Sequence, residues 1–388
     1  MNEKKTCPIC NSQRLNRFLT RENVPVHQNY LCKDQKSAID ITRGHLQLVV
    51  CEDCGFVFNQ TFSLSKLSYG EKYDNAQDFS PMFEKHISNL VNHLVLEKNV
   101  KNCNIVEVGC GKGSFLKRLV KDEKWANNGF GFDPSYDGPE SILNGRLKFQ
   151  KSYYDSKSVQ IPADVIICRH VIEHVPEPLN LIQQVHKSLK NSSNSHVFFE
   201  TPTVEWILKN NVVWDFFYEH CSLFSKNSIK TAFEISGFVV EDICSVFQNQ
   251  YLWLEASVSS KKLEITKNPD SIPGLATKFS KYEQQLIKNW KSKIQKLKLD
   301  GNTAIWGAGA KGVTFANLID PHLELINSII DLNPNKQGKF LPGTGHPIIN
   351  YKNIPKKGIK NVILMNPNYY NEILTMLNKE KIDVTIIN

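Results

Sequence analysis

The chain has 388 residues, 41% of them hydrophobic and 22% charged, which predicts an ordinary globular protein of two or three domains. No apolar run is long enough to span a membrane, and the polar start Met1–Lys5 does not resemble a secretory signal, so we expect a cytoplasmic protein with no membrane partner. The formal net charge of +8 is spread along the chain without basic blocks or interleaved aromatic residues, which argues against a nucleic-acid partner.

Two C-x-x-C pairs stand near the N-terminus, and a glycine follows the second pair. Each pair offers two sulfurs from one tight turn, and two pairs complete the tetrahedral thiolate shell of a structural Zn²⁺ site. The predicted metal ligands are Cys7, Cys10, Cys51 and Cys54. The alternatives are that these are coincidental free cysteines, or that His27 or Cys32, which lie between the pairs, replaces one ligand.

The segment Ile105–Leu119 predicts a buried strand, a glycine turn and a helix that opens directly from the turn. A dinucleotide-binding fingerprint has the form G-x-G-x-x-G, but Ser114 stands at the position of its third glycine. The segment therefore does not match a dinucleotide-binding motif. The pattern E-x-G-x-G-x-G instead resembles the first motif of class I S-adenosylmethionine (SAM) methyltransferases, and this resemblance implies SAM as the cofactor. The motif residues are Glu107, Gly109, Gly111 and Gly113.

Alternating strands and helices follow, which predicts a doubly wound α/β sheet. The strand Gly129–Phe132 ends at Asp133, where a carboxylate can accept both hydroxyls of an adenosine ribose; the alternative is a turn-forming aspartate before a proline. After the short strand Leu147–Gln150, Tyr154 is expected beside the adenine.

The next strand, Asp164–Cys168, leads into Arg169 and His170. We expect Arg169 beside the methionine part of the cofactor and His170, with His174 shortly after it, beside the substrate, because ligands bind at the carboxyl ends of parallel strands. A further strand is expected at His196–Glu200.

The loop Trp214–Phe224 brings a phenol, a carboxylate and an imidazole together at Tyr218, Glu219 and His220. Imidazole is the natural base near neutral pH, and a neighbouring carboxylate can fix its tautomer. The alternative is a buried histidine with a structural role.

A long charged helix, about Ala276–Leu299, introduces the last third of the chain. There a second glycine motif, G-x-G-x-x-G, follows a short strand, with Asp331 at the spacing of a ribose-binding acid and Lys311 suited to a phosphate. Taken alone, the motif suggests NAD. It is equally open to holding the nucleotide end of an activated substrate, or to shaping the fold only. The glycines are Gly307, Gly309 and Gly312.

Together the zinc pairs, the SAM motif, an E-H-x-S-x-F loop and the second glycine motif resemble the three-part sugar C-methyltransferase family. The resemblance covers essentially the whole chain and implies a zinc-binding module over 1–68, a class I methyltransferase core over 69–262 and a Rossmann-like substrate domain over 263–388. It implies methylation of a carbon next to the ketone of a nucleotide-linked deoxysugar. Family members carry Tyr-His-Glu-His in the loop, with the last histidine as the base; here Phe217 and Tyr218 replace the first two residues, which leaves the acceptor open.

Our hypothesis is that His220 removes the proton alpha to the ketone while Tyr218, His170 or His174 stabilises the enolate oxygen. Tyr73, in the aromatic segment before the SAM core, is a candidate substrate contact; the alternative is a structural role in a segment that packs on the core as a lid or brace. The remaining alternatives are an O- or N-methyltransferase, an NAD-dependent oxidoreductase that uses the C-terminal turn, and a binding protein with a relic SAM fold. The oligomeric state is open.

Overall fold

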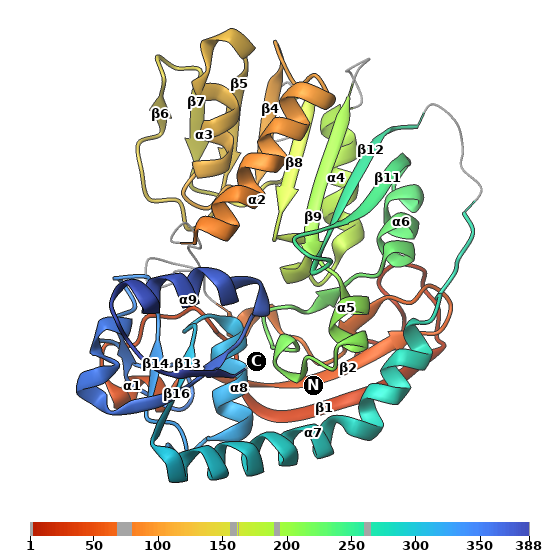
Figure 1. The fold of residues 1–388 in the computed structure, drawn as a ribbon. Helices are drawn as coiled ribbons and strands as arrows, with labels where there is room; N and C mark the ends of the chain where they lie inside the picture. The colour runs from red at the N-terminus through yellow and green to blue at the C-terminus, as the bar shows by residue number, and fades with distance from the viewer. Residues whose placement is uncertain are drawn as a thin grey trace.

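The computed structural model describes residues 3–67, 80–155, 161, 163–189, 195–259 and 265–387. Figure 1 shows three sheets, one in each predicted part of the chain, with the central sheet standing apart from the other two. No helix within the described ranges is both long and apolar enough to cross a bilayer.

The N-terminal sheet is antiparallel and has the order β1-β2-β3-β10. Its strands are β1 (Leu15–Pro25), β2 (Arg43–Cys51), β3 (Val57–Asn59) and β10 (Ser222–Leu223), and α1 (Gln35–Ile39) and the short helix η1 (Leu64–Lys66) flank them. The fourth strand is supplied by the middle of the chain, because Ser222 pairs with Phe58 and Leu223 pairs with Val57. The predicted N-terminal module is therefore completed by the residues that follow His220.

The central sheet has eight strands in the order β11-β12-β9-β8-β4-β5-β7-β6. They are β4 (Asn104–Val108), β5 (Asn128–Phe132), β6 (Ser141–Ile142), β7 (Leu147–Gln150), β8 (Val165–Arg169), β9 (His196–Pro202), β11 (Phe238–Val246) and β12 (Tyr251–Val258). The chain enters at β4, moves outward through β5 and β7, and then returns to β8 and β9 on the other side of β4. This is the predicted doubly wound α/β sheet. The order in which the chain adds strands reverses between β4 and β8, and sheets of this kind bind ligands at such a switch point.

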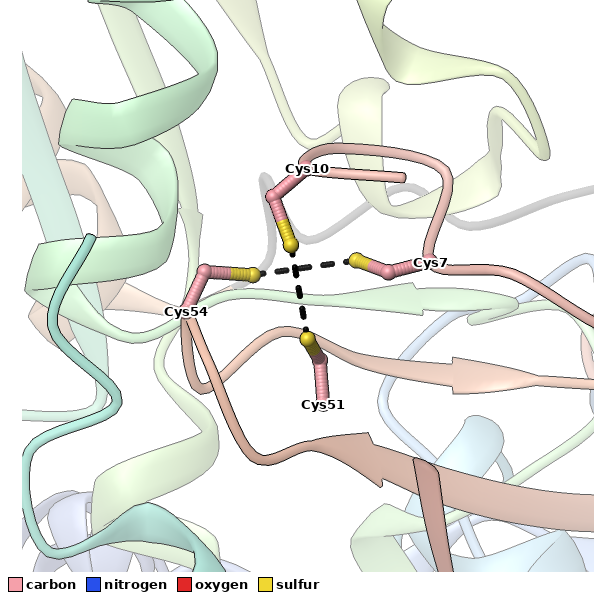
Figure 2. A group of neighbouring side chains, drawn as sticks. All are labelled: Cys7, Cys10, Cys51 and Cys54. Carbon is pink, nitrogen blue, oxygen red and sulfur yellow. Dashed lines mark hydrogen bonds between the residues drawn. The ribbon is translucent and has the colours of Figure 1, made fainter. Parts of the chain in front are cut away.

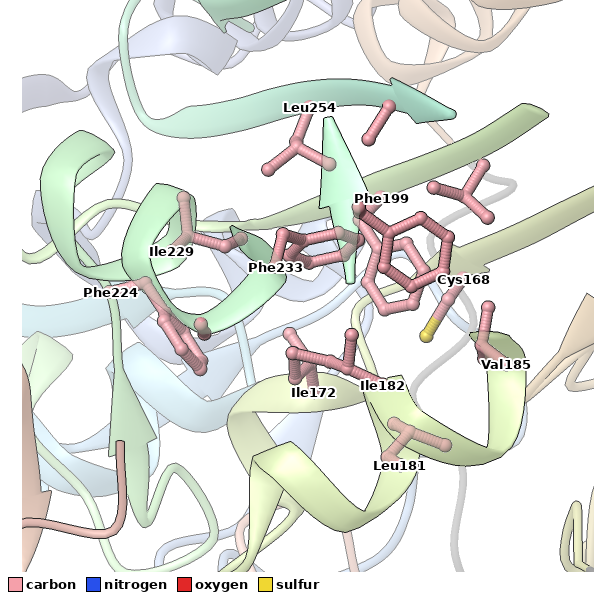
Figure 3. Close-up of a cluster of buried hydrophobic side chains, with 14 of the residues drawn as sticks. Cys168, Ile172, Leu181, Ile182, Val185, Phe199, Phe224, Ile229, Phe233 and Leu254 are labelled. Atoms are coloured by element: carbon pink, nitrogen blue, oxygen red, sulfur yellow. The ribbon is translucent and has the colours of Figure 1, made fainter. Parts of the chain in front are cut away.

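Helices lie on both faces of this sheet (Figure 1). The helical segments of the central part of the chain, in sequence order, are α2 (Pro81–Asn92), the π-helix η2 (His93–Glu97), α3 (Ser114–Lys121), η3 (Glu123–Trp125), η5 (Ile172–His174), α4 (Pro178–Leu189), α5 (Val204–Lys209), η6 (Val213–Asp215) and α6 (Lys226–Ile235). Figure 3 shows the apolar layer that α4 and α6 form against the sheet, where the rings of Phe199 and Phe233 meet edge to face at 4.9 Å between centroids. This packing fixes the strands whose ends carry the site.

The C-terminal sheet is parallel, with the order β15-β14-β13-β16-β17. Its strands are β13 (Asn302–Trp306), β14 (Ser328–Ile330), β15 (Ile348–Ile349), β16 (Ile359–Leu364) and β17 (Thr385–Ile387). The helices are α7 (Ile272–Asp300), α8 (Ala310–Ile319), η7 (Tyr351–Asn353), η8 (Pro355–Lys357), η9 (Pro367–Tyr369) and α9 (Tyr370–Lys379). The chain again enters in the middle and winds outward in both directions, so the strand order of this sheet reverses between β13 and β16, the position at which doubly wound sheets bind ligands.

The three parts interlock. Helix α7 runs along the N-terminal sheet (Figure 1), and its Glu283 forms an ion pair of 2.7 Å with Arg21 of β1; both side chains are buried. Gln250 of the central part and Asn366 of the C-terminal part exchange two amide hydrogen bonds of 2.9 and 3.1 Å. Breaking any one of these contacts leaves buried polar groups unpaired, so we expect the parts to be held in one arrangement.

Candidate active site

The four predicted zinc ligands form one compact buried group (Figure 2). The Sγ atoms of Cys7 and Cys54 lie 3.7 Å apart, and those of Cys10 and Cys51 lie 3.5 Å apart. A tetrahedral shell with Zn–S bonds of about 2.3 Å requires S–S separations of about 3.8 Å, so the donor set fits a zinc ion. Four thiolates leave no open position, and the site is suited to a structural metal.

His27 and Cys32 do not belong to this group. The ring of His27 packs against Tyr30, with 5.6 Å between the centroids, and the carbonyl of Cys32 accepts a hydrogen bond from the backbone of Phe340 in the C-terminal part. Cys32 therefore lies on the side of the N-terminal module that contacts the C-terminal part.

The first glycine motif forms the turn between β4 and α3. Gly109, Gly111 and Gly113 all have positive φ, of 71°, 54° and 75°. A Cβ on Gly109 would lie 2.1 Å from a methyl group of Val171, whereas a Cβ on Gly111 would have no atom within 4 Å. The turn is thus packed on one side and presents bare backbone to open space at Gly111, as a cofactor cradle requires.

The two acidic residues of this turn occupy different environments. Asp133 accepts hydrogen bonds from the backbone of Gly111 at 2.9 Å and of Ser135 at 2.7 Å, so it braces the turn and keeps lone pairs for a ribose. Glu107 is buried, and one of its oxygens has no hydrogen-bond partner among the described residues. Burial raises the pKa of Glu107 to about 8, although the positive charge of Arg169 opposes the shift.

Two further predicted cofactor contacts, Tyr154 and Arg169, have partners within the protein. Tyr154 packs in the core with its ring edge to face against Phe132, and its hydroxyl is hydrogen-bonded to Ser188, so we do not keep it as an adenine contact. The guanidinium of Arg169 lies 4.3 Å above the ring of Phe115 and donates to Glu200 at 2.8 Å. Arg169 therefore lies against the first turn of α3, next to the glycine turn, and its contact with the cofactor stays a prediction.

A cavity of about 300 Å³ lies between the central and C-terminal parts. The residues directly after β8, β13, β14 and β16 and the last residue of β9 all contribute to its wall, so the carboxyl ends of parallel strands from both sheets meet there. Representative wall residues are His170, His220, Gly307, Asp331 and Asn366. The predicted substrate-binding residues Gly309, Lys311 and Gly312 also line it. Tyr73, the remaining predicted contact, lies outside the described residues.

Three side chains at one end of the cavity form a tight cluster. The ligand atoms of Glu173, His174 and His220 all lie within 4.8 Å of one another. The rings of His174 and His220 meet edge to face at 4.8 Å, and the ring of Phe217 lies 4.1 Å from that of His220. The loop sequence alone pointed to Glu219 as the carboxylate of this site; the structure adds Glu173.

The histidines of the cavity have opposite electrostatic environments. Burial, together with His174, His170 and Lys311, holds the pKa of His220 well below its usual 6.5, so this imidazole is neutral at pH 7. His170 is partly buried, which lowers its pKa, but the carboxylates of Glu200 at 3.3 Å and Glu173 at 3.5 Å outweigh this effect and raise the pKa to about 9. The cavity thus holds a neutral base and a cationic imidazolium side by side.

Tyr218 and Glu219 point toward the N-terminal module. The hydroxyl of Tyr218 accepts a hydrogen bond of 2.9 Å from the backbone of Ser63, and its ring packs over Gly44, where a Cβ would lie 2.4 Å away. This placement corrects the expectation that Tyr218 donates to an enolate. Glu219 lines the cavity, but one of its oxygens accepts the backbone N–H of Gln28 at 2.7 Å.

The C-terminal glycine turn is built like the first one. Asp331 accepts the backbone N–H of Ala308 at 2.7 Å, just as Asp133 accepts that of Gly111. Lys311, the predicted phosphate ligand, forms an ion pair with Asp215 and lies 5.3 Å over the ring of Trp206. Its charge is already compensated within the protein.

Some functional groups had no clear signal in the sequence. Glu173 lies in the R-H-V-I-E-H run but is separated from His220 by 47 positions, so only the fold brings them together. Glu200 lies in β9, which runs two residues past the predicted end at Glu200, and its basic neighbours come from α2 (His86), the end of β8 (Arg169) and the residue after it (His170). The loop Leu341–His346 does not line the cavity; its His346 is buried against Asp320 at 3.0 Å.

Comparison with known proteins agrees with this division of the chain. Residues 80–243 match the family model described as a methyltransferase domain, and residues 267–383 match the one described as a C-methyltransferase C-terminal domain. The chain therefore carries a SAM-dependent methyltransferase domain followed by a C-methyltransferase C-terminal domain.

Among curated proteins, the chain is similar to ubiquinone biosynthesis O-methyltransferases. The one from Aliivibrio fischeri is 27% identical over 146 residues, which cover 33% of this chain and 56% of that protein. The one from Vibrio cholerae is 30% identical over 142 residues, covering 33% and 54%. The chain spans about half the length of these relatives.

Among solved structures, magnesium protoporphyrin IX methyltransferase from Synechocystis with bound SAH is 18% identical, with a TM-score of 0.34 over 46% of this chain and 84% of that one.

Proposed function

We propose that this protein transfers a methyl group from SAM to the carbon next to a ketone of a nucleotide-linked deoxysugar. The observation that carries the proposal is that one cavity joins a neutral histidine base to a second glycine turn of the nucleotide-binding type. The match of residues 267–383 to a C-methyltransferase C-terminal domain supports the choice of carbon as the acceptor.

His220 is the proposed general base. A proton alpha to a ketone is only weakly acidic, so its removal requires an unprotonated base next to the carbon and stabilisation of the enolate oxygen. The imidazole of His220 meets the first requirement because burial and nearby cations keep it neutral. When His220 takes the proton, Glu173 in the same cluster stabilises the resulting imidazolium.

His170 is the proposed electrophile for the enolate oxygen. Its imidazolium is held by the carboxylates of Glu173 and Glu200 and lines the same cavity. The backbone at His170 has a positive φ of 53°, an uncommon conformation for a residue with a side chain. Strain of this kind is retained where it aims a functional group, which supports a role for His170 in catalysis.

The turn at Gly109–Gly113 is the proposed SAM seat. It stands beside the switch point between β4 and β8, and His170 follows β8 directly, so the donor and the acceptor are brought to the same edge of the sheet. Bound there, SAM supplies a methyl group on a positively charged sulfur. The buried carboxyl of Glu107 fits a cationic cofactor, because a nearby positive charge favours its ionised form.

O-Methylation is the second candidate, because the curated relatives are named O-methyltransferases. The same His220 would then deprotonate a hydroxyl group. Solvent exchange separates the two: a carbon acid exchanges its alpha proton with the solvent, whereas a hydroxyl acceptor leaves every carbon-bound hydrogen in place.

The test is to incubate the protein in D₂O with nucleotide-linked 4-keto-deoxysugars and S-adenosylhomocysteine and to follow deuterium at the alpha carbon by NMR. We expect exchange with the wild-type protein and a loss of about 10²–10⁴-fold for His220→Gln, with SAM affinity retained in calorimetry. Exchange at the wild-type rate in His220→Gln would remove His220 as the base.

A further inference from the structure

We propose that Lys336 and Asn333, together with the amino end of α8, form the seat for the diphosphate group of the acceptor. Nothing in the sequence motifs marked these two residues. The proposal rests on the proposed function, in that it names the anionic handle by which the activated acceptor is held.

Lys336 is a buried cation with only neutral partners. Its side chain is 5% exposed and lines the cavity, and its Nζ donates to the Oδ1 atom of Asn29 and to the carbonyl of Ala308, both at 3.1 Å. Among the residues that the structure describes, no carboxylate forms an ion pair with it. A buried lysine is rarely left unpaired, so an anion is the missing partner.

Asn333 adds an unused donor to the same wall. It is 2% exposed, and its Oδ1 atom accepts the backbone N–H of Asn335 at 2.9 Å, which fixes the orientation of the amide. The Nδ2 group then has no hydrogen-bond partner within the described part of the chain. Because a buried donor without a partner is costly, a ligand oxygen at this position stabilises the site.

The amino end of α8 opens on the same space. Gly309, Ala310 and Lys311 line the cavity at the start of this ten-residue helix. A Cβ on Gly312 would lie 1.9 Å from the carbonyl of Gly307, so the turn is closed tightly on itself, and the first N–H groups of α8 have no partner within the helix. Helix N-termini favour anions through these donors and through the helix dipole.

The choice of Lys336 over Lys311 follows from the partners of the two ammonium groups. Lys311 has its counterion in Asp215, whereas Lys336 has none. Asp331, at the carboxyl end of β14, is placed to accept ribose hydroxyls beside this seat, as in other doubly wound sheets. The seat, the ribose acid and the His220 cluster share one cavity, so a nucleoside diphosphate can hold its sugar toward the base.

The test is calorimetric titration of the full chain with UDP and TDP, and with uridine and thymidine as diphosphate-free probes. For Lys336→Met we expect diphosphate affinity to fall about 10–100-fold, the loss of one charge-assisted contact, with Lys336→Arg intermediate. Lys339→Met, three residues away and outside the cavity wall, serves as the matched control and should bind as the wild type does. Unchanged SAM affinity shows that each variant is folded.

Asn333→Ala is the second variant, and it should weaken the diphosphates while leaving the nucleosides unaffected. Equal binding of UDP or TDP by the wild type and Lys336→Met would overturn the proposal, as would tighter binding of NADH than of either diphosphate. The protein could bind diphosphates in a way that depends on Lys336 and yet transfer no methyl group to any nucleotide-linked keto-sugar. That result would support the diphosphate site and refute the proposed function.

Discussion

The imidazoles of His174 and His220 meet edge to face at 4.8 Å between their centroids, although they come from two different parts of the central fold. His174 ends the short helix after β8, and His220 precedes the strand that joins the N-terminal sheet. Burial lowers the pKa of both rings, and each positive charge would repel the other. The pair thus favours a neutral His220, which is the state that a base must have.

The pH dependence of turnover tests these electrostatic assignments. His220 must be neutral to act, and its pKa is lowered, so activity should be retained at pH 7 and lost only well below 6.5. His170 must be protonated, and its pKa is about 9, so activity should fall as the pH rises through 9. A profile of kcat/KM against pH measures both limbs. An acid limb at or above 6.5 would contradict the account.

Glu200 should control the basic limb of that profile. It accepts hydrogen bonds from His86 at 2.6 Å and from Arg169 at 2.8 Å, and it lies 3.3 Å from His170. Glu200→Gln removes a negative charge from His170, so the basic limb should move down by about one pH unit or more. Glu205→Gln, which removes an exposed partner of Lys209, is the control and should leave the profile in place. A structural role alone would lower stability without moving the limb.

Tyr218 should matter for stability and not for chemistry. Tyr218→Phe removes the acceptor of the Ser63 N–H and should lower the free energy of unfolding by about 1 kcal/mol, measured in urea, with kcat within about twofold of the wild type. Tyr153→Phe, at an exposed tyrosine next to the core residue Tyr154, is the matched control and should change neither. A loss of turnover of about 10²-fold in Tyr218→Phe would restore it to the mechanism.

The cysteine cluster should bind about one zinc ion per chain. Cys51→Ser removes a thiolate from the shell and should leave almost no metal by atomic absorption, whereas Cys32→Ser should keep it. Turnover should fall with the metal, because Cys51 ends β2 and the sheet that it anchors includes the strand after His220. Zinc retained in Cys51→Ser would refute the assignment.

The parallel sheets could be predicted from the sequence because buried strands and glycine turns have strong local signals. Strand Leu147–Gln150 and the helix that opens after Gly113 appear where expected. The pairing of Ser222–Leu223 with β3 had no such signal, since two residues carry no periodicity and the partner lies more than 160 positions away. The predicted boundaries at 68 and 262 remain predictions, and this pairing crosses the first of them.

Side-chain roles were harder to predict than the fold. His220 and His170 were singled out by residue type, and both line the cavity. Tyr218 sits two positions from His220, a spacing that puts both side chains on one face of an extended strand, but the chain turns at Tyr218 and Glu219, and Tyr218 faces the N-terminal module. Lys336 resembles any surface lysine in the sequence, and only its burial reveals the missing anion.

The most direct measurement is to supply SAM with a ¹³C-labelled methyl group and a nucleotide-linked 4-keto-deoxysugar, and to locate the label in the product by NMR. The account predicts a new carbon–carbon bond at the position next to the ketone, formed by the wild type and lost in His220→Gln. A methyl group on oxygen or nitrogen, or no transfer by a preparation that binds both ligands, would contradict it.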